Sequence, residues 1–206
     1  MVGEEATAEE ESLTRLIRTA EAVWLVDPLD GTSNFIAGST DHSVMVALVE
    51  EGCTVASWMW HPATGVMAYA RRGGGAWLND EQAVARAPVQ DVAFLRGVLK
   101  KRFLPDRVRQ RVDGDRGVLA AASEGRNCAG LDYPDLVRGA VDFLLYWRTL
   151  PWDHAPGVLF AQEGGLHAAR PDGSDYHPGE DASGLLISHR QIWDNVRDAL
   201  FEDAPS

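Results

Sequence analysis

Acidic side chains stand at three places in this sequence where they could take part in hydrolysis. Each place alone is weak evidence, because carboxylates at strand ends are commonly just solvated. A carboxylate at the start of a helix also serves as a cap, and this is the plainest interpretation of Asp153 taken by itself. The three places are Glu4 with Glu5, Asp27 with Asp30, and Asp153.

The pair Asp27 and Asp30 is harder to explain as ordinary surface. It follows residues 23–26, a short apolar run that predicts a buried strand. The strand is expected to stop before Asp27, because Pro28 and Gly31 forbid its continuation. Two carboxylates in a partly buried loop repel each other unless a cation neutralises them. Carboxylate oxygens are hard ligands, which favour Mg²⁺, Mn²⁺ or Ca²⁺ over Zn²⁺. The spacing therefore predicts a divalent metal site.

Gly31 and Thr32 follow this acidic pair directly. Their backbone N–H groups, at a predicted helix start, suit a phosphate group that bridges to the metal ions. The hydroxyl of Thr32 can orient or deprotonate a water molecule. Carboxylates, a metal, anion-binding amides and a hydroxyl together predict metal-assisted hydrolysis of a phosphoester.

The composition of the 206 residues is that of an ordinary globular chain, with 45% hydrophobic and 24% charged residues. A net charge of −12 argues against nucleic acid as a main partner. The apolar runs are far shorter than the roughly 20 residues of a membrane helix, and no signal sequence opens the chain. We therefore expect a soluble, cytoplasmic protein without a membrane partner, in which Cys53 and Cys128 are reduced, structural thiols.

The first half of the chain predicts a helix followed by an antiparallel sheet. Leu13, Leu16 and Ile17 have the spacing of a short amphipathic helix that opens with the acidic stretch 9–12. Apolar runs separated by turn residues then predict a meander of strands. These strands cover residues 23–26, 43–49, 55–60 and 66–70.

In the second half, predicted strands and helices alternate, so the chain as a whole predicts a layered α/β fold. The helices are expected over residues 134–141 and 153–163 and after Ser188, which can cap the last of them. The strands are expected over residues 143–147, 166–169 and 185–188.

Two further segments could bind anions but have simpler interpretations. The glycine triplet 73–75 is interpreted as a turn, because neither a dinucleotide-binding nor a Walker pattern surrounds it. Residues 95–111 are rich in Lys and Arg, with few aromatic residues between them. A solvated surface is the first interpretation of this basic stretch, and attraction of an anionic substrate is the second.

Three segments resemble, in order and spacing, the signature segments of the inositol monophosphatase family. They are residues 3–5 (G-E-E), 27–35 (D-P-L-D-G-T-S-N-F) and 152–157 (W-D-H-A-P-G), the last continuing to E-G-G at 163–165. The resemblance extends over nearly the whole chain and implies one α/β domain over residues 1–206, an α-β-α-β-α sandwich. Residues 1–90 would form the metal-loop and antiparallel-sheet half, and residues 91–206 the C-terminal α/β half.

The resemblance also implies a function. It implies Mg²⁺-dependent hydrolysis of a small phosphorylated metabolite, an inositol monophosphate or a related sugar or polyol phosphate. Two or three Mg²⁺ ions would act, with Mn²⁺ as a substitute and Li⁺ as an inhibitor, in a cytoplasmic homodimer. Carried over residue by residue, Glu4, Asp27 and the Leu29 carbonyl would bind the first metal ion, and Asp27, Asp30 and Asp153 the second.

The same comparison implies which groups meet the substrate. The amides of Gly31 and Thr32 would cradle its phosphate, and Thr32 with Glu4 would position the attacking water. No covalent enzyme intermediate is required when metal ions clamp the attacking and leaving oxygens. The implied substrate-binding residues are Gly31, Thr32, Ser33, Tyr146 and Asp153.

This sequence departs from the family at the sugar-binding end. Residues 127–132 replace a Gly-Ser-Ala-type segment, and Tyr146 stands seven residues before Asp153, where inositol-specific members place an acid. Tyr146 can hydrogen-bond a hydroxyl, or it can simply pack on Trp147 or Trp152. Inositol monophosphate is therefore one candidate substrate, beside adenosine bisphosphate, histidinol phosphate and fructose bisphosphate.

A second departure lies at the front of the chain. Family members carry helices before G-E-E that cover one sheet face and supply an acid that partners the catalytic threonine. We expect either a fragment or misassigned start of a longer protein, or a shortened form covered by a partner subunit. Strands 23–26 and 44–49 should then expose an apolar patch, Glu4 should sit in a fraying terminus, and activity should be low.

A catalytically impaired relative, acting as a metal- or anion-binding or interaction protein, is the rival hypothesis. The joint presence of the carboxylates and Thr32 favours catalysis, because a non-catalytic protein has no chemical need for all of them. Release of phosphate from a panel of monophosphates with and without Mg²⁺ separates the two.

Overall fold

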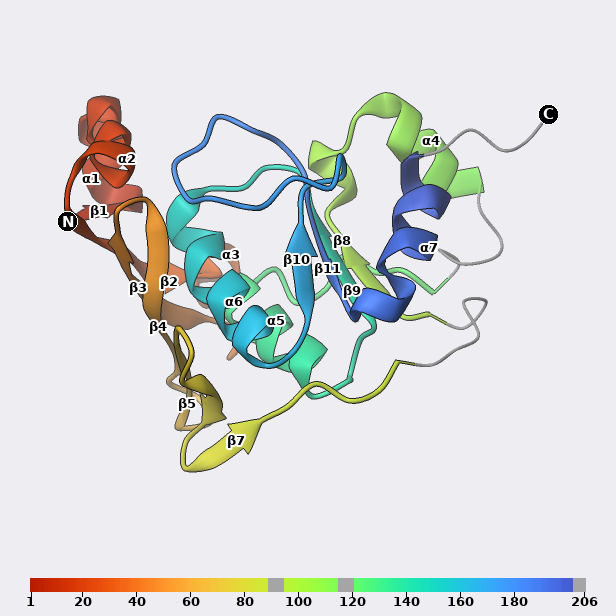
Figure 1. The fold of residues 1–206 in the computed structure, drawn as a ribbon, viewed down its shortest axis with the longest axis horizontal. Coiled ribbons are helices and arrows are strands. Elements are labelled where there is room, and N and C mark those ends of the chain that lie inside the picture. The colour runs from red at the N-terminus through yellow and green to blue at the C-terminus, as the bar shows by residue number, and fades with distance from the viewer. Residues whose placement is uncertain (89–94, 115–120, 202–206) are drawn as a thin grey trace.

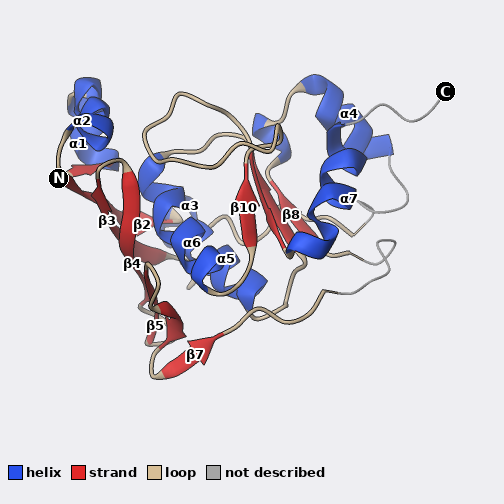
Figure 2. Cartoon of the chain, viewed as in Figure 1, coloured by secondary structure: helices blue, strands red, loops and turns tan. Residues whose placement is uncertain are grey.

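The computed structural model describes residues 1–88, 95–114 and 121–201 (Figure 1). Two β-sheets lie with a pair of helices between them, α5 (Ala129–Val137) and α6 (Pro151–Glu163). A second helix pair, α4 (Asp106–Gly114) and α7 (Arg190–Phe201), flanks the far side of the second sheet (Figure 2). This is the layered α/β arrangement that the sequence predicts.

The first sheet has seven strands in sequence order. All neighbours pair antiparallel except β1 and β2, which are parallel, so the predicted meander is confirmed from β2 onward. The strands are β1 (Val2–Gly3), β2 (Ala22–Asp30), β3 (Ser43–Glu50), β4 (Cys53–His61), β5 (Val66–Arg71), β6 (Gly75–Leu78) and β7 (Glu81–Ala83).

The second sheet has four strands in the order β10-β11-β9-β8, and β8 and β9 are parallel. Its strands are β8 (Gly97–Leu99), β9 (Phe143–Tyr146), β10 (His167–Ala169) and β11 (Leu185–Ser188). The helices are α1 (Glu4–Glu9), α2 (Leu16–Thr19), α3 (Thr32–Ile36), α4 (Asp106–Gly114), α5 (Ala129–Val137), α6 (Pro151–Glu163) and α7 (Arg190–Phe201). No helix in the described ranges has the length and apolar character that crossing a membrane requires.

Helix α6 forms the centre of the molecule. Its residues from His154 to Ala161 are buried without interruption, so the helix has no solvated stripe. The largest core cluster joins residues of the first sheet, such as Met59, to residues of the second sheet, such as Leu144, through Phe160 of α6. A helix that is apolar on all sides is stable only when it is enclosed, and the two sheets enclose α6.

The N-terminus is held in place, which corrects the expectation that Glu4 lies in a fraying end. Val2 and Gly3 pair with Leu25 and Val26 of β2, and Val2 is fully buried. Gly3 is required for this pairing, because a Cβ atom there would clash with the carbonyl oxygen of Val26. Glu4 therefore begins α1 at a fixed position on the edge of the first sheet.

The predicted helix around Leu16 and Ile17 is also different from the observed one. The chain is helical from Glu4, but Glu10 is extended, with φ −142° and ψ 92°, and divides α1 from the turns that follow. Ile17 on α2 is buried in a cluster with Val23 and Leu25 of β2. The acidic first turn of the helix is thus Glu4 and Glu5, and within the stretch 9–12 the helix breaks at Glu10, before a 3₁₀ helix over Glu11–Arg15.

Helix α5 begins five residues before the predicted start at Pro134. Proline lacks an N–H group, so the carbonyl of Gly130, four residues earlier, loses its usual helical donor. Nε2 of His61 on β4 donates to this carbonyl at 2.7 Å. A side chain from the first sheet thereby satisfies the group that Pro134 leaves open, and the helix passes through the proline.

The glycine triplet 73–75 is a turn, as predicted, and its amides are occupied. The N–H groups of Gly73 and Gly75 donate to the two carboxylate oxygens of Glu163, each at 2.8 Å. This turn is therefore bound to the C-terminal end of α6, and its amides are already bound to a carboxylate of the chain itself.

The face of the first sheet opposite α6 is apolar and exposed. In the described structure no helix lies over it, and Trp24 and Trp60 are 45% and 36% exposed. The rings of Trp24 and Trp58 are 6.0 Å apart on this face. One row of cross-strand partners spans five strands without a charged residue: Val26, Val46, Trp58, Tyr69 and Trp77. This matches the expected apolar patch.

The double variant Trp24→Lys with Trp60→Lys should reduce self-association of the chain. The two lysines place charge on an apolar surface that would otherwise be buried against another copy. Light scattering against protein concentration measures the effect. Ile36→Lys, at an exposed apolar residue of α3 and not of the first sheet, should leave association unchanged. Equal association of the double variant and the parent would show that the face is not adhesive.

Candidate active site

A β-bulge aims Asp27 and Asp30 at the same site. Residues three apart on a regular strand point to opposite faces of the sheet. In β2, however, Asp27 pairs with Met45 and Asp30 with Ser43, so three steps on β2 match two on β3. The extra residue turns both carboxylates to the same side. Pro28 fits the bulge because it has no N–H to offer a neighbouring strand.

Both carboxylates line a pocket of about 480 Å³ between the first sheet and the start of α6. The structure brings together in this pocket all the residues that the sequence predicts for the site, although they come from distant parts of the chain. They are Glu4, Asp27, Leu29, Asp30, Gly31, Thr32, Ser33, Tyr146 and Asp153.

One oxygen of Asp30 is held by three donors. Its Oδ2 accepts hydrogen bonds from the Gly130 amide at 2.7 Å, the Cys128 thiol at 3.1 Å and the Ser43 hydroxyl at 3.2 Å. Asp30 thereby joins β2 to the start of α5 and has its other oxygen available to the pocket. Ser43 and Cys128 are therefore supporting residues that the sequence analysis did not assign to the site.

Asp153 does not cap α6, although it stands in the first turn of that helix. In the described structure, no side chain makes a capping hydrogen bond at the α6 N-terminus. Burial raises the pKa of Asp153 well above its ordinary value, and the charges of Asp30 and Asp27 raise it further. The interpretation of Asp153 as a helix cap is therefore wrong, and its carboxylate belongs to the pocket.

The pKa values of the other carboxylates in the pocket are shifted in the same direction. Burial raises the pKa of Asp27 to about 7, and the nearby charges of Asp30 and Glu4 add to the effect against one hydrogen bond from the Leu29 amide. Burial also raises the pKa of Asp30. The pocket therefore gathers several acids whose ionised forms are unfavourable without a positive charge among them.

Divalent cations fit this donor set. The available ligands are carboxylate oxygens and the Leu29 carbonyl, all hard oxygen donors of the kind that Mg²⁺ takes. In the described part of the chain, no three such side chains already converge closely enough to hold an ion. Binding of an ion would therefore have to draw Asp27, Asp30 and Asp153 together. The charge of the ion would relieve the repulsion between these carboxylates.

Gly31 shapes the turn between these acids and α3. Its φ of 85° lies in the left-handed region, and a Cβ atom there would come within 2.8 Å of the Asp41 carbonyl oxygen. Helix α3 begins directly after it, so the amides of its first turn lack intrahelical acceptors. The Thr32 hydroxyl donates to the Leu29 carbonyl at 2.9 Å, which fixes its direction.

Tyr146 is committed to another side chain. Its hydroxyl donates to Asp132 Oδ2 at 2.9 Å, and its ring packs on Tyr133 and His154. The suggested packing on Trp147 or Trp152 is thus replaced by a stack between α5 and α6. Burial raises the pKa of Asp132 to about 6. Tyr146 still lines the pocket, so it can accept a hydrogen bond from a ligand while donating to Asp132.

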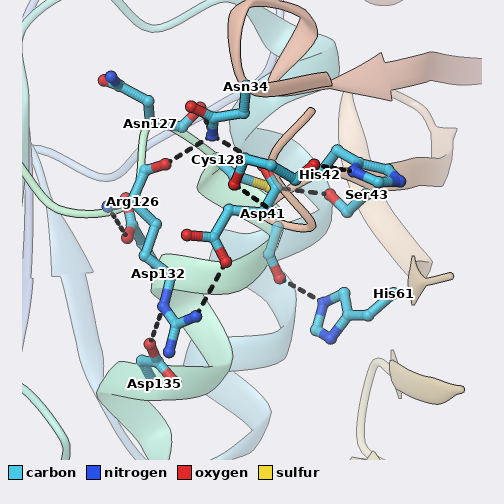
Figure 3. A network of polar contacts seen from close by, with 12 residues as sticks. Asn34, Asp41, His42, Ser43, His61, Arg126, Asn127, Cys128, Asp132 and Asp135 are labelled. Atoms are coloured by element: carbon cyan, nitrogen blue, oxygen red, sulfur yellow. Dashed lines mark hydrogen bonds and ion pairs between the residues drawn. The ribbon is translucent and has the colours of Figure 1, made fainter. Parts of the chain in front are cut away.

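A clamp that the sequence analysis missed holds the two sides of the pocket together (Figure 3). The Asn34 side-chain amide donates to the carbonyls of Asp41 and Arg126, each at 2.7 Å. The Arg126 guanidinium pairs with Asp41 at 3.1 Å and with Asp135 of α5 at 2.9 Å. The loop that carries Thr32 is thereby fixed to the segment that holds Asp30. Such pairing across 92 residues leaves no local signal in sequence.

Curated proteins with similar sequences are phosphatases and Nus factors. The chain is 33% identical over 151 residues to the Nus factor SuhB of Vibrio cholerae, a match that covers 70% of this chain and 55% of that protein. It is 29% identical to the fructose-1,6-bisphosphatase/inositol-1-monophosphatase of Thermotoga maritima, covering 73% and 57%. The inositol-1-monophosphatase of Rhizobium meliloti is 29% identical, covering 89% and 69%. The chain thus spans little more than half the length of the first two relatives.

Solved structures share the fold. Inositol monophosphate-bound SaIMPase-II superposes with a TM-score of 0.83 at 18% identity, covering 98% of this chain and 75% of that one. The Thermotoga maritima IMPase superposes with a TM-score of 0.74 at 26% identity, covering 88% and 69%.

The family model named Inositol monophosphatase family matches residues 1–202, a range that includes every residue of the pocket. The acidic pocket, the fold and the sequence match agree, and the chain belongs to the inositol monophosphatase family.

Proposed function

We propose that this chain hydrolyses a small phosphate monoester with the help of Mg²⁺. The observation that supports the proposal most is that Asp27, Asp30 and Asp153 line one pocket beside the N-terminus of α3. Buried acids of like charge suit cation binding, and the first amides of a helix suit a phosphate. Release of phosphate from inositol, sugar and nucleotide monophosphates, with and without Mg²⁺, tests it directly.

Different residues of the chain have different roles in the proposed hydrolysis. The amides at Gly31 and Thr32 would hold the phosphate oxygens, since the α3 turn leaves these N–H groups without helical partners. The Thr32 hydroxyl donates to the Leu29 carbonyl, so its lone pairs remain to accept a hydrogen bond from the attacking water and orient it. Glu4, at the pocket edge, would take up the proton that this water releases.

The cations supply the electrophilic part of the chemistry: when bound, divalent ions polarise the phosphate and lower the pKa of a coordinated water. Glu4, Asp27 and the Leu29 carbonyl would hold one ion, and Asp27, Asp30 and Asp153 another. Mn²⁺ has the same preference for oxygen ligands and would substitute for Mg²⁺, whereas Li⁺ would compete for the site without the same charge.

The names of some relatives favour a second candidate. Relatives such as the Vibrio cholerae protein are named Nus factors, so the chain could act through protein contacts instead of turnover. The sheet face that carries Trp24, Trp58 and Trp60 offers an apolar surface for such contacts, or for a homodimer. If Mg²⁺ raises the rate of hydrolysis of any monophosphate above the metal-free rate, the catalytic function is favoured over the interaction function.

Asp27→Asn should raise the stability of the metal-free protein at pH 8, because Asp27 has a folded-state pKa of about 7 against an ordinary value of 3.8. The folded state holds this proton more tightly than the unfolded state, so the parent loses stability as the pH rises from about 4 to about 7. The asparagine keeps the acceptor for the Leu29 amide. Thermal unfolding of both proteins at pH 5 and pH 8 measures the difference.

Addition of Mg²⁺ at pH 8 should reverse the order, raising the unfolding temperature of the parent by mass action and that of Asp27→Asn much less. Asp80→Asn, a change at an exposed carboxylate outside the pocket, is the matched control. An equal Mg²⁺ response in Asp27→Asn and Asp80→Asn would refute the assignment of Asp27 as a ligand.

Thr32→Ala should lower kcat by about 100-fold with little change in KM, as expected for a positioned proton-transfer group. Thr32→Ser should retain most of the activity, because its hydroxyl can make the same bond to the Leu29 carbonyl. Steady-state kinetics with the best substrate of the panel measures both. A loss confined to KM would instead assign Thr32 to substrate binding alone.

A further inference from the structure

Asp30 offers only one of its two carboxylate oxygens to the pocket. The Gly130 amide, the Cys128 thiol and the Ser43 hydroxyl all donate to its Oδ2. A carboxylate oxygen has about two lone-pair sites, so three donors leave none for a further ligand. Among the described residues, the Oδ1 atom of Asp30 has no hydrogen-bond partner. Asp30 can therefore bind an ion through Oδ1 alone.

Asp27 is less restricted than Asp30. Its Oδ1 accepts one hydrogen bond, from the Leu29 amide at 2.9 Å, and in the described structure its Oδ2 accepts none. Lone-pair sites therefore remain on both oxygens of Asp27. This difference fits the ligand sets proposed above, in which Asp27 contacts two ions and Asp30 contacts one. The restriction to one oxygen is specific to Asp30.

The three donors to Asp30 come from two elements that meet β2. Ser43 begins β3, and Cys128 and Gly130 stand at the N-terminus of α5, which has no side-chain cap of its own. Asp30 thus accepts a first-turn amide of this helix from outside, where a negative charge is favourable. A Cβ atom on Gly130 would lie 2.1 Å from the Ser43 hydroxyl oxygen, so glycine permits this close approach.

Burial makes the arrangement around Oδ2 difficult to change. Ser43 and Cys128 are 0% and 1% exposed, so water cannot readily replace Asp30 as the partner of their donors. Rotation of the carboxylate to bring Oδ2 to an ion would leave buried donors unpaired, which is costly. The side chain of Asp30 is therefore held with Oδ2 in the interior and Oδ1 toward the pocket.

The number of oxygens that a carboxylate offers affects which divalent ion it suits. Ca²⁺ takes a larger and more flexible set of oxygen ligands than Mg²⁺, often with both oxygens of one carboxylate. Mg²⁺ is smaller and requires nearly ideal octahedral geometry. An aspartate that presents a single oxygen in a fixed direction suits Mg²⁺, and it withholds a contact that Ca²⁺ would use.

We propose that Cys128 and Ser43 are positioning residues that restrict Asp30 to one oxygen and thereby make the pocket select Mg²⁺ over Ca²⁺. This inference rests on the proposed function, because it concerns an ion that the hydrolysis would use. It goes further by assigning the choice of ion to two side chains that touch neither the ion nor the substrate. The chemistry of the acids alone suits both ions.

The test measures binding of Mg²⁺ and of Ca²⁺ by isothermal titration calorimetry, without any substrate. The parent should bind Mg²⁺ more tightly than Ca²⁺. In the double variant Ser43→Ala with Cys128→Ala, Oδ2 keeps the Gly130 amide and regains a lone-pair site. The ratio of the Ca²⁺ Kd to the Mg²⁺ Kd should then fall at least about 10-fold, the lower end of what one hydrogen bond to a charged group provides.

Two further variants separate this role from a structural one. Cys128→Ser in the Ser43→Ala background returns one donor to Oδ2 and differs from the double variant by a single oxygen atom, so it should restore the ratio of the parent. Cys53→Ala removes the other thiol, which lies on β4 outside the pocket, and should leave the ratio unchanged. Thermal unfolding without metal compares the stability of all variants.

The possible failures are distinguishable. An unchanged ratio in the double variant, or equal weakening of both ions without rescue by Cys128→Ser, would overturn this inference. Mg²⁺-dependent release of phosphate by the parent would leave the proposed function standing in either case. Failure of the parent to bind either ion would overturn both this inference and the proposed role of Mg²⁺.

Discussion

Repulsion among buried carboxylates is the constraint on which the rest of this structure depends. Burial raises the pKa of Asp27, Asp30 and Asp153. The charge of Asp30 raises the pKa of Asp27 and of Asp153 further, and the charge of Asp27 also raises that of Asp153. A chain that only needed stability would place apolar groups here. In this fold, a β-bulge, Gly31 in the left-handed conformation and three hydrogen-bond donors to Asp30 instead hold the acids at one site. Such a local conflict with stability is what a binding site for cations requires.

Neither sheet contains the site alone. Asp30 belongs to β2, but the donors that hold it include the Gly130 amide and the Cys128 thiol at the start of α5. The clamp of Asn34 and Arg126 ties the same two segments together a second time. Loss of either segment would leave a buried carboxylate without its donors, which is costly. Assembly of the site and packing of α5 on the first sheet are therefore one event.

The sequence predicts most of the elements and the membership of the pocket. Apolar runs separated by turn residues predict β3, β4 and β5 closely, because both the strand and the turn that ends it leave a local pattern in the sequence. The acids and Gly31 could be assigned because they form a specific string. The layered fold also followed from the order of elements, since strands and helices with one apolar side must cover each other.

What could not be predicted depends on partners far away in the sequence. Helix α5 passes through Pro134 because His61, on another element, supplies the missing donor. The end of β2 was placed before Asp27, yet pairing with β3 extends it to Asp30 through a bulge. Tyr146 on β9 donates to Asp132 on α5, a contact that depends on how this helix packs on the second sheet. In each case a tertiary contact overrides the local rule.

Helix α6 connects the acidic pocket to the turn between β5 and β6 of the first sheet. Asp153 stands in its first turn and Glu163 at its last residue, where it holds the β5–β6 turn of the first sheet. Each residue of a helix advances the chain by about 100° of rotation, so one inserted or deleted residue would swing Asp153 out of the pocket or Glu163 off the turn. The length of α6 is thus constrained by Asp153 at one end and by Glu163 at the other. A change in the length of α6 would therefore separate the acidic pocket from the β5–β6 turn, whereas the loops of the chain carry no such double constraint.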